Sequence, residues 1–287
     1  MGFNSIVCVK QVPDTANITS DAMTPEGTVN RAALPAIFNP EDLHALETAL
    51  EIRDRFGGTV TVLTMGLPKA AEVLRSCLYR GADRAILLTD RRAAGSDTLA
   101  TSYILSQIVR TIGNYDFVFC GRQAIDGDTA QTGPQIAEKL EIPQVTYLEK
   151  VIDLKDGTPK TARLRRNTGN GFEIVDVQLP VLVTVIETAN DPRPFAARKV
   201  MRFKHAAVPA EVTPEKAEEL KAKGLLMEQW TLDDVNADLN RCGMAGSPTK
   251  VFRIESIVLT KEGFVQIAPT EEGVTGLVQE LIADRTL

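Results

Sequence analysis

The sequence predicts an α/β fold: a parallel sheet with helices on both faces, followed by a β-meander and a C-terminal arm. Three observations predict it. Up to about residue 140, short apolar runs alternate with amphipathic segments, which is typical of parallel strands joined by helical crossovers. Residues 146–187 contain strand-like runs separated by polar turns. From about residue 205 the chain has too few apolar residues to form a core of its own.

The parallel sheet is assigned to four apolar runs, and helices are expected between them. The predicted strands are Ser5–Val9, Gly58–Met65, Arg84–Leu88 and Asp116–Cys120. The predicted helices are 40–54, 68–80 and 96–111. In the first helix, leucines recur at spacings of three and four, which places them on one face. Asn39 is expected to cap this helix, and Pro40 suits its first position.

The second part of the chain is expected to be a four-stranded meander and then a tail. The meander strands are Thr146–Leu154, Thr161–Arg165, Phe172–Gln178 and Val181–Glu187. In the tail, helices are expected at Pro214–Lys223 and Glu272–Ala283. We divide the chain into an α/β domain, residues 1–227, and an arm, residues 228–287, which must bury its apolar side against something else, such as another chain.

Composition excludes several classes of function. With 287 residues the chain makes roughly two domains or one large one. Lys and Arg number 32 and Asp and Glu 38, a net charge of −6, which disfavours nucleic-acid binding. The apolar runs are too short to span a membrane and the N-terminus does not resemble a secretory signal, so a cytoplasmic protein is expected. Four cysteines without CxxC spacing and two histidines make a zinc or iron–sulfur site improbable.

Ligands on such sheets bind beyond the carboxyl ends of the strands, which directs attention to segments 10–15, 39–42, 65–68, 89–98 and 121–133. In the last of these, a loop with two glycines and two aspartates follows a strand, and a helix is expected to begin near Thr129, capped by Asp128 or Thr129. Free amides of that first turn would form an anion site. The loop is thus either a phosphate cradle or an ordinary capped connection, since P-loop and GxGxxG patterns are absent.

The charged residues of this loop have two interpretations each. Asp126 and Asp128 are either a carboxylate pair for acid–base work or, more simply, capping and ribose-binding groups. Arg122 either pairs with a phosphate or is a solvated surface residue. Neither a Ser-His-Asp nor a Cys-His set is evident, and His44 lies inside a helix pattern. The inventory favours a nucleotide binder whose cofactor carries the chemistry and leaves open whether the chain is an enzyme.

Several motifs resemble the beta subunit of electron-transfer flavoprotein. They are Lys10–Thr15 (KQVPDT), Asn39-Pro40, Gly81–Asp83, Ser96–Thr101, Gly121–Gly133 and Ala245–Thr249. The resemblance covers essentially the whole chain and implies a Rossmann-like nucleotide-binding domain of the adenine nucleotide alpha hydrolase type. Val12–Thr15 and Gly127–Ala130 resemble the electron-bifurcating, nitrogen-fixation-type branch.

The resemblance implies a heterodimer with a flavoprotein alpha subunit. In the bifurcating branch the beta chain holds an FAD that accepts hydride from NADH. One electron passes to ferredoxin or flavodoxin. The other passes through the alpha-subunit FAD to an acyl-CoA dehydrogenase, a related dehydrogenase or a quinone reductase. Two alternatives stay open: a conventional beta subunit that holds structural AMP, and a stand-alone adenine-nucleotide-binding regulatory protein.

The resemblance also implies site residues. Cofactor contacts are expected at Val9, Lys10, Pro13, Asn39, Pro40, Glu41, Asp42, Gly66, Arg122, Gln123, Ala124, Ile125, Asp126, Gly127, Asp128, Thr129, Ala130, Gln131 and Thr132. Asp97 and Thr98 are expected to face NADH. Partner docking is expected at Asn190, Asp191, Pro192, Arg193 and Pro194, where two prolines reduce the entropy lost on docking.

Overall fold

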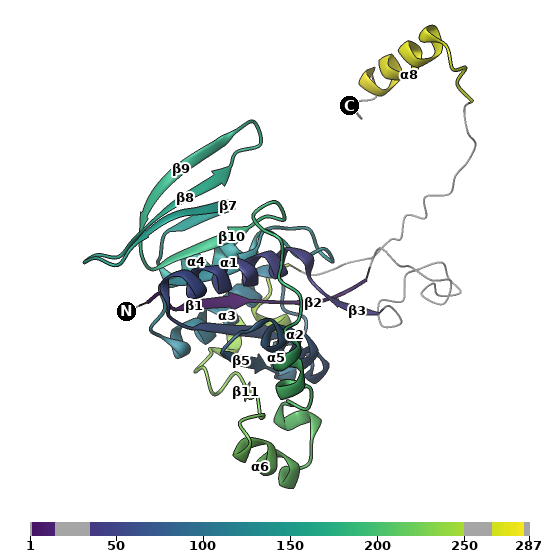
Figure 1. The fold of residues 1–287 in the computed structure, drawn as a ribbon. Helices are drawn as coiled ribbons and strands as arrows, with labels where there is room; N and C mark the ends of the chain where they lie inside the picture. The colour runs from purple at the N-terminus through teal and green to yellow at the C-terminus, as the bar shows by residue number, and fades with distance from the viewer. Residues whose placement is uncertain (1, 15–34, 250–265, 284–287) are drawn as a thin grey trace, which may run out of the picture.

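A nine-stranded, mostly parallel sheet organises the part of the chain that the computed structural model describes, residues 2–14, 35–249 and 266–283 (Figure 1). Its strand order is β11-β5-β4-β1-β6-β10-β7-β8-β9. The strands are β1 (Ser5–Cys8), β4 (Val60–Met65), β5 (Arg84–Leu88), β6 (Phe117–Gly121), β7 (Gln144–Lys155), β8 (Thr161–Asn167), β9 (Phe172–Gln178), β10 (Val181–Val185) and β11 (Glu228–Trp230). All neighbours pair in parallel except β7 with β8 and β8 with β9. The predicted α/β class is confirmed.

Helices cover both faces of the sheet because strand side chains alternate between them. Val7 of β1 belongs to one buried cluster, with side chains of α1 (Pro40–Phe56) and α2 (Ala71–Arg80). Ile6, its neighbour, belongs to the other, with side chains of α3 (Thr98–Ile112) and α4 (Thr132–Leu140). Such double coverage is what a parallel sheet requires.

The order of strands reverses at β1. The chain runs outward from β1 through β4 to β5 on one side, and returns to place β6 on the other side of β1. The carboxyl ends of β1 and β6 therefore lie side by side with connections leaving in opposite directions, which is where doubly wound sheets bind ligands.

The prediction of a four-stranded meander was wrong in its last strand. Strands β7, β8 and β9 form the antiparallel extension seen at the upper left of Figure 1. β10 returns to the main sheet and pairs in parallel with both β6 and β7. All five of its residues are buried, and four of them are valine or leucine, so it does not show the apolar–polar alternation of a strand with one solvated face.

Shorter elements complete the described residues. An antiparallel pair of strands, β2 (Gln11–Pro13) and β3 (Ala36–Phe38), was not predicted; Thr15 of the preceding motif lies outside the described residues. The remaining helices are η2 (Pro68–Ala70), η3 (Arg91–Ala93), α5 (Ala197–Phe203), η4 (Pro209–Glu211), α6 (Pro214–Ala222), η5 (Leu239–Arg241), α7 (Gly243–Gly246) and α8 (Glu271–Ala283).

Two parts of the predicted arm differ in how far they are buried. It begins as β11, which adds an edge strand to β5. In α8, by contrast, no residue is buried, and its apolar side chains are exposed: Val274, Leu277, Val278 and Ile282. None of the helices in the described ranges is both long and apolar enough to cross a membrane.

Candidate functional site

A cavity of about 640 Å³ lies at the carboxyl ends of β1, β4 and β6. Its lining comes from three places: the ends of these strands, the loop and first turns around the start of α3, and the loop between β6 and α4. The volume falls within the range of small-molecule and cofactor sites, about 300–1,000 Å³. The cavity therefore occupies the position that the strand-end rule predicts.

Side chains at the start of α1 form hydrogen bonds with the loop after β6. The side chain of Asn39 donates from Nδ2 to the Gln123 carbonyl (2.9 Å) and accepts at Oδ1 from the Ile125 amide (3.2 Å). Glu41 accepts from the Gln123 amide (2.7 Å) and pairs with Arg122 Nη2 (2.7 Å). The prediction that Asn39 caps α1 was wrong, because its polar atoms bind the loop instead.

The helix after this loop begins later than predicted. α4 starts at Thr132, and neither Asp128 nor Thr129 caps it. Asp128 (φ 50°) and Ala130 (φ 52°) adopt the left-handed conformation, which excludes both from a right-handed helix. The loop thus extends up to the first residue of α4.

Consecutive backbone N–H groups at the end of this loop have no hydrogen-bond partner in the described residues. Within the described chain, the amides of residues 129–133 have no hydrogen-bond acceptor, and all five residues line the cavity. Unpaired backbone N–H groups at a helix start attract anions. The predicted amide cluster is therefore present, although the helix boundary was misplaced.

The charged residues of the loop bind separate partners. Lys10 Nζ lies 2.7 Å from an oxygen of Asp126, and Asp128 accepts a hydrogen bond from the Gln123 side chain (2.9 Å). Arg122 keeps a buried Nε without an acceptor in the described residues. Because a buried unpaired donor is costly, Nε of Arg122 is a group that a ligand oxygen or nitrogen would satisfy.

Asp42 ties the ends of the two central strands together. Its carboxylate accepts from the Lys10 amide, beyond β1 (2.9 Å), and from the Gly121 amide at the end of β6 (3.0 Å). Burial raises the pKa of Asp42 to about 7, against the opposing effect of its hydrogen bonds and of Lys10. Asp42 thus sets the separation of the two strand ends at the floor of the cavity.

The floor also contains two thiols. Cys8 and Cys120 occupy neighbouring strands, both are buried, and both line the cavity. A hydrogen bond with Cys8, and then burial, raise the pKa of the Cys120 thiol well above its usual value. A thiol in that state is a poor nucleophile. Among the described residues no cluster of three or more His, Cys, Asp or Glu is arranged to hold a metal ion.

Most of the expected cofactor residues line this cavity. They are Val9, Lys10, Asp42, Arg122, Gln123, Ala124, Asp126, Gly127, Asp128, Thr129, Ala130, Gln131 and Thr132. Six do not line it: Pro13, Asn39, Pro40, Glu41, Gly66 and Ile125. Of these, Asn39 and Glu41 bind the backbone of the loop after β6, and Pro13 belongs to the β2–β3 pair.

Other lining residues were not among the expected cofactor or NADH contacts. They are Cys8, Leu63, Met65, Ala93, Gly95, Ser96, Thr101, Leu105, Cys120, Gly121 and Gly133. Several lie in the strand-end segments 65–68, 89–98 and 121–133 and were within reach of that rule. Thr101 belongs to the motif Ser96–Thr101, whereas Leu105 lies further along α3, so only the packing of that helix reveals it.

Asp97 and Thr98 line the same cavity, and their side-chain oxygens form hydrogen bonds within the protein. Asp97 caps α3 by accepting from the Ala100 amide (3.0 Å) and also accepts from the Thr249 amide (3.0 Å). Thr98 donates to the Gln131 side chain (3.0 Å). The pKa of Asp97 is lowered, because these amide hydrogen bonds outweigh the effect of burial.

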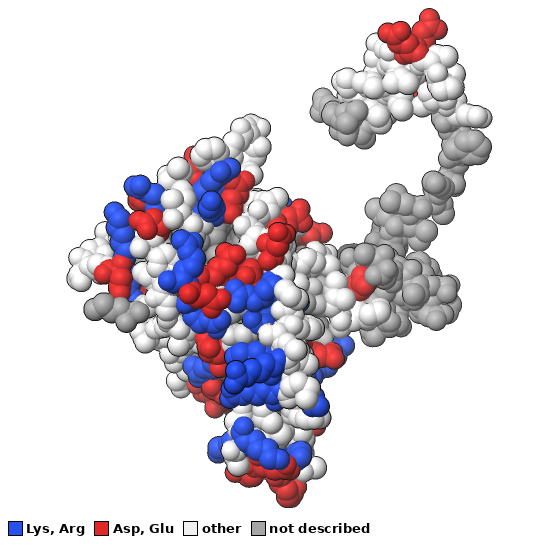
Figure 2. All heavy atoms as spheres, in the orientation of Figure 1, with Lys and Arg blue, Asp and Glu red and all other residues white. Residues whose placement is uncertain are grey.

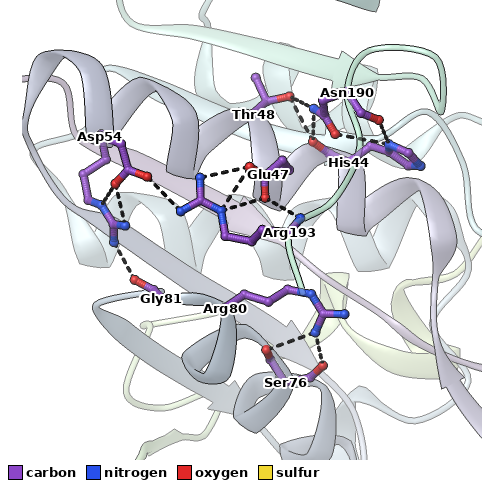
Figure 3. A network of polar contacts seen from close by, with 10 residues as sticks. His44, Glu47, Thr48, Asp54, Ser76, Arg80, Gly81, Asn190 and Arg193 are labelled. Atoms are coloured by element: carbon purple, nitrogen blue, oxygen red, sulfur yellow. Dashed lines mark hydrogen bonds and ion pairs between the residues drawn. The ribbon is translucent and has the colours of Figure 1, made fainter. Parts of the chain in front are cut away.

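The expected docking loop is clamped onto α1, away from this cavity (Figure 3). Asn190 donates to the His44 carbonyl (3.0 Å) and to Thr48 Oγ1 (2.9 Å). Arg193 binds the buried carboxylate of Glu47 through its guanidinium (2.9 Å) and its own amide (3.0 Å). These side chains fix the loop in one position on the helix.

The surface beside this loop carries positive charge. Phe195 is half exposed, and the Arg80 guanidinium lies 4.2 Å from its ring centroid. α5, which follows, contributes Arg198, Lys199 and Arg202. Figure 2 shows Lys and Arg gathered in this region, whereas both charge signs are interspersed over the rest of the visible face.

Comparison with known proteins identifies the family. Residues 26–217 match the model of the electron transfer flavoprotein domain. A protein of Clostridium acetobutylicum named electron transfer flavoprotein subunit beta is 43% identical over 97% of this chain and 98% of its own length. Protein FixA of Bradyrhizobium diazoefficiens is 40% identical over 99% of this chain and 92% of its own length.

A third relative is named as part of a larger complex. The caffeyl-CoA reductase-Etf complex subunit CarD of Acetobacterium woodii is 42% identical over 86% of both chains. These similarities confirm the resemblance drawn from the sequence motifs: the chain belongs to the electron transfer flavoprotein family, as a relative of its beta subunits.

Proposed function

We propose that this chain is the beta subunit of a heterodimeric, electron-bifurcating electron transfer flavoprotein of the cytoplasm, and that its strand-end cavity holds FAD. When bound, the FAD would accept hydride from NADH and supply electrons singly to ferredoxin or flavodoxin and, through the alpha-subunit FAD, to a partner dehydrogenase such as an acyl-CoA dehydrogenase or to a quinone reductase. The proposal rests above all on the run of five unpaired amides in a cavity of this family.

The residues present fit a flavin dinucleotide. The amides of residues 129–133 suit the pyrophosphate, whose charge they would neutralise. The buried Nε of Arg122 suits a further acceptor atom of the same molecule. Leu63, Met65 and Leu105 add apolar walls suited to rings. Each of these groups binds or orients, and none is a proton donor for the reaction.

The other regions would serve the remaining partners. Asp97 and Thr98 would form the side that NADH approaches. The clamped loop Asn190–Pro194 would dock the dehydrogenase, with little entropy lost on binding because it is already fixed on α1. The arm, residues 228–287, would bury the exposed apolar side chains of α8 against the alpha subunit.

The test is the cofactor count of the purified heterodimer. We expect a second FAD beyond that of the alpha subunit, released by acid and identified by mass spectrometry, together with NADH oxidation. One FAD per heterodimer with AMP, and no NADH oxidation, would instead establish the conventional beta subunit. A monomer that binds adenine nucleotide with α8 ordered in isolation would indicate the stand-alone regulator.

A further inference from the structure

The motif Ala245–Thr249 has no role in the function proposed above, yet the structure brings it to the cavity. Ser247 is buried, and its Oγ accepts a hydrogen bond from the Asp97 amide (2.9 Å) while donating to the Gly243 carbonyl (2.7 Å). Asp97 lies about 150 residues earlier in the chain. The start of the arm is thus hydrogen-bonded to the loop that lines one side of the cavity.

Three more contacts join the same two segments. The Thr249 amide donates to Asp97 Oδ2 (3.0 Å), and the Gly243 amide donates to Ser96 Oγ (3.0 Å). Gly243 adopts φ +58°, and a Cβ there would lie 2.2 Å from the Arg92 carbonyl oxygen. The arm therefore approaches the backbone before α3 so closely that only glycine fits at this position.

The loop that the arm holds, Gly95–Thr98, is part of the cavity wall. Asp97 caps α3, and Thr98 donates a hydrogen bond to the side chain of Gln131, in the loop between β6 and α4 whose free amides line the cavity. A shift of Gly95–Thr98 would therefore move two walls of the site. This loop contains both residues expected to face NADH.

We propose that Ser247 is a positioning residue of the dinucleotide site: it holds the Gly95–Thr98 loop in the geometry that binds NADH, so that the arm and not the α/β domain alone sets the affinity for NADH. The inference rests on the proposed function for the identity of the ligand. The contacts between arm and loop do not depend on that identity, so the two can be tested separately.

The experiment compares Ser247→Ala with the wild type as the heterodimer with its alpha subunit. The variant leaves the Asp97 amide and the Gly243 carbonyl without their partner. Ser247→Cys keeps the size of the side chain while its thiol is a weaker hydrogen-bonding group, and it serves if Ser247→Ala does not fold. Thr270→Ala is the matched control, because it removes another hydroxyl that accepts an amide in the same tail, that of Gly273 (3.2 Å), at the start of α8.

Two readouts are needed: hydrogen exchange of the amides in residues 93–101, and the dissociation constant and KM for NADH. Ser247→Ala should accelerate exchange at Asp97 and Ala100 by about fivefold or more, the effect of losing one buried hydrogen bond, and Ser247→Cys should change exchange in the same direction. Both should raise the NADH dissociation constant and KM by a similar factor, with the resident nucleotide retained. Thr270→Ala should change none of these.

Unchanged exchange in both variants would overturn the proposal. Faster exchange with an unchanged NADH dissociation constant would also overturn it, because the loop would then move without affecting the ligand. Failure of the proposed function has a different signature: the wild-type heterodimer itself would bind no NADH, which overturns the assignment of the ligand, while the exchange data still decide whether Ser247 holds the loop.

Discussion

Replacing Asp42 by asparagine tests whether a buried carboxylate joins the two central strands. Both carboxylate oxygens of Asp42 accept backbone amides, one at Lys10 and one at Gly121. Asparagine offers one acceptor oxygen, so one buried amide loses its partner. That loss costs about 1–3 kcal/mol. Against it stands the removal of a buried negative charge, whose cost depends on pH.

The pH dependence follows from the pKa of Asp42, which burial raises from 3.8 to about 7. Because the folded state holds the proton more tightly than the unfolded state, stability is greatest below pH 4 and falls as pH rises through about 7. At 1.36 kcal/mol per pKa unit the full effect is about 4 kcal/mol. Between pH 5 and pH 8 it amounts to about 3 kcal/mol.

The assay is urea unfolding of the wild type and Asp42→Asn at pH 5, 6, 7 and 8, at one protein concentration. We expect the unfolding free energy of the wild type to fall, relative to the variant, by about 3 kcal/mol across this range. Asp191→Asn removes an exposed carboxylate and keeps Asp42. The difference in unfolding free energy between the wild type and Asp191→Asn should therefore not follow this trend. A difference between wild type and Asp42→Asn that stays constant from pH 5 to pH 8 would refute the assigned pKa shift.

Three further variants probe the site and the docking loop. Gly121→Ala would place a Cβ within 2.8 Å of backbone at the start of α1. We expect the unfolding free energy to fall by about 1–3 kcal/mol, seen as a lower Tm, and an unchanged Tm would contradict this close approach. Glu47→Gln weakens the binding of Arg193 to α1. It should accelerate hydrogen exchange in residues 190–194 about fivefold without affecting nucleotide content. Loss of nucleotide instead would show that the effect of this ion pair extends beyond the docking loop. Asp128→Ala combined with Thr129→Ala removes the hydrogen bond that Asp128 accepts from the Gln123 side chain within the cavity loop. It should weaken retention of the resident nucleotide about fivefold, measured by its dissociation rate, and unchanged retention would show that these side chains do not hold the loop in its binding geometry.

The strand–helix alternation of the first half was sufficient to predict the parallel sheet, because each of those strands is a short apolar run next to an amphipathic helix. The same reasoning failed for β10, which follows an antiparallel extension in the chain and was assigned to it. Its five buried residues distinguish it from β7, β8 and β9, but the sequence does not specify which strands a strand buried on both faces will pair with. Pairing depends on the packing of the whole sheet.

For the site, local chemistry identified the loop after β6 and the free amides beside α4. It misplaced the start of α4, because Asp128 and Ala130 adopt left-handed conformations that neither residue type requires. It also assigned Asn39 to its own helix, although its side chain binds a loop 84 residues later. An asparagine satisfies either set of backbone groups equally well, and only proximity decides between them.

The sequence by itself determined the class of fold, the family and the segments from which the cavity is built, because periodicity, turn residues and strand-end motifs are local properties of the chain. Only the tertiary structure decided that Asp42 joins β1 to β6, that α1 supports the amide-bearing loop, and that Ser247 reaches Asp97. Each of these joins groups far apart in the chain, and a hydrogen bond depends on the distance between its atoms in space, which the order of residues does not specify.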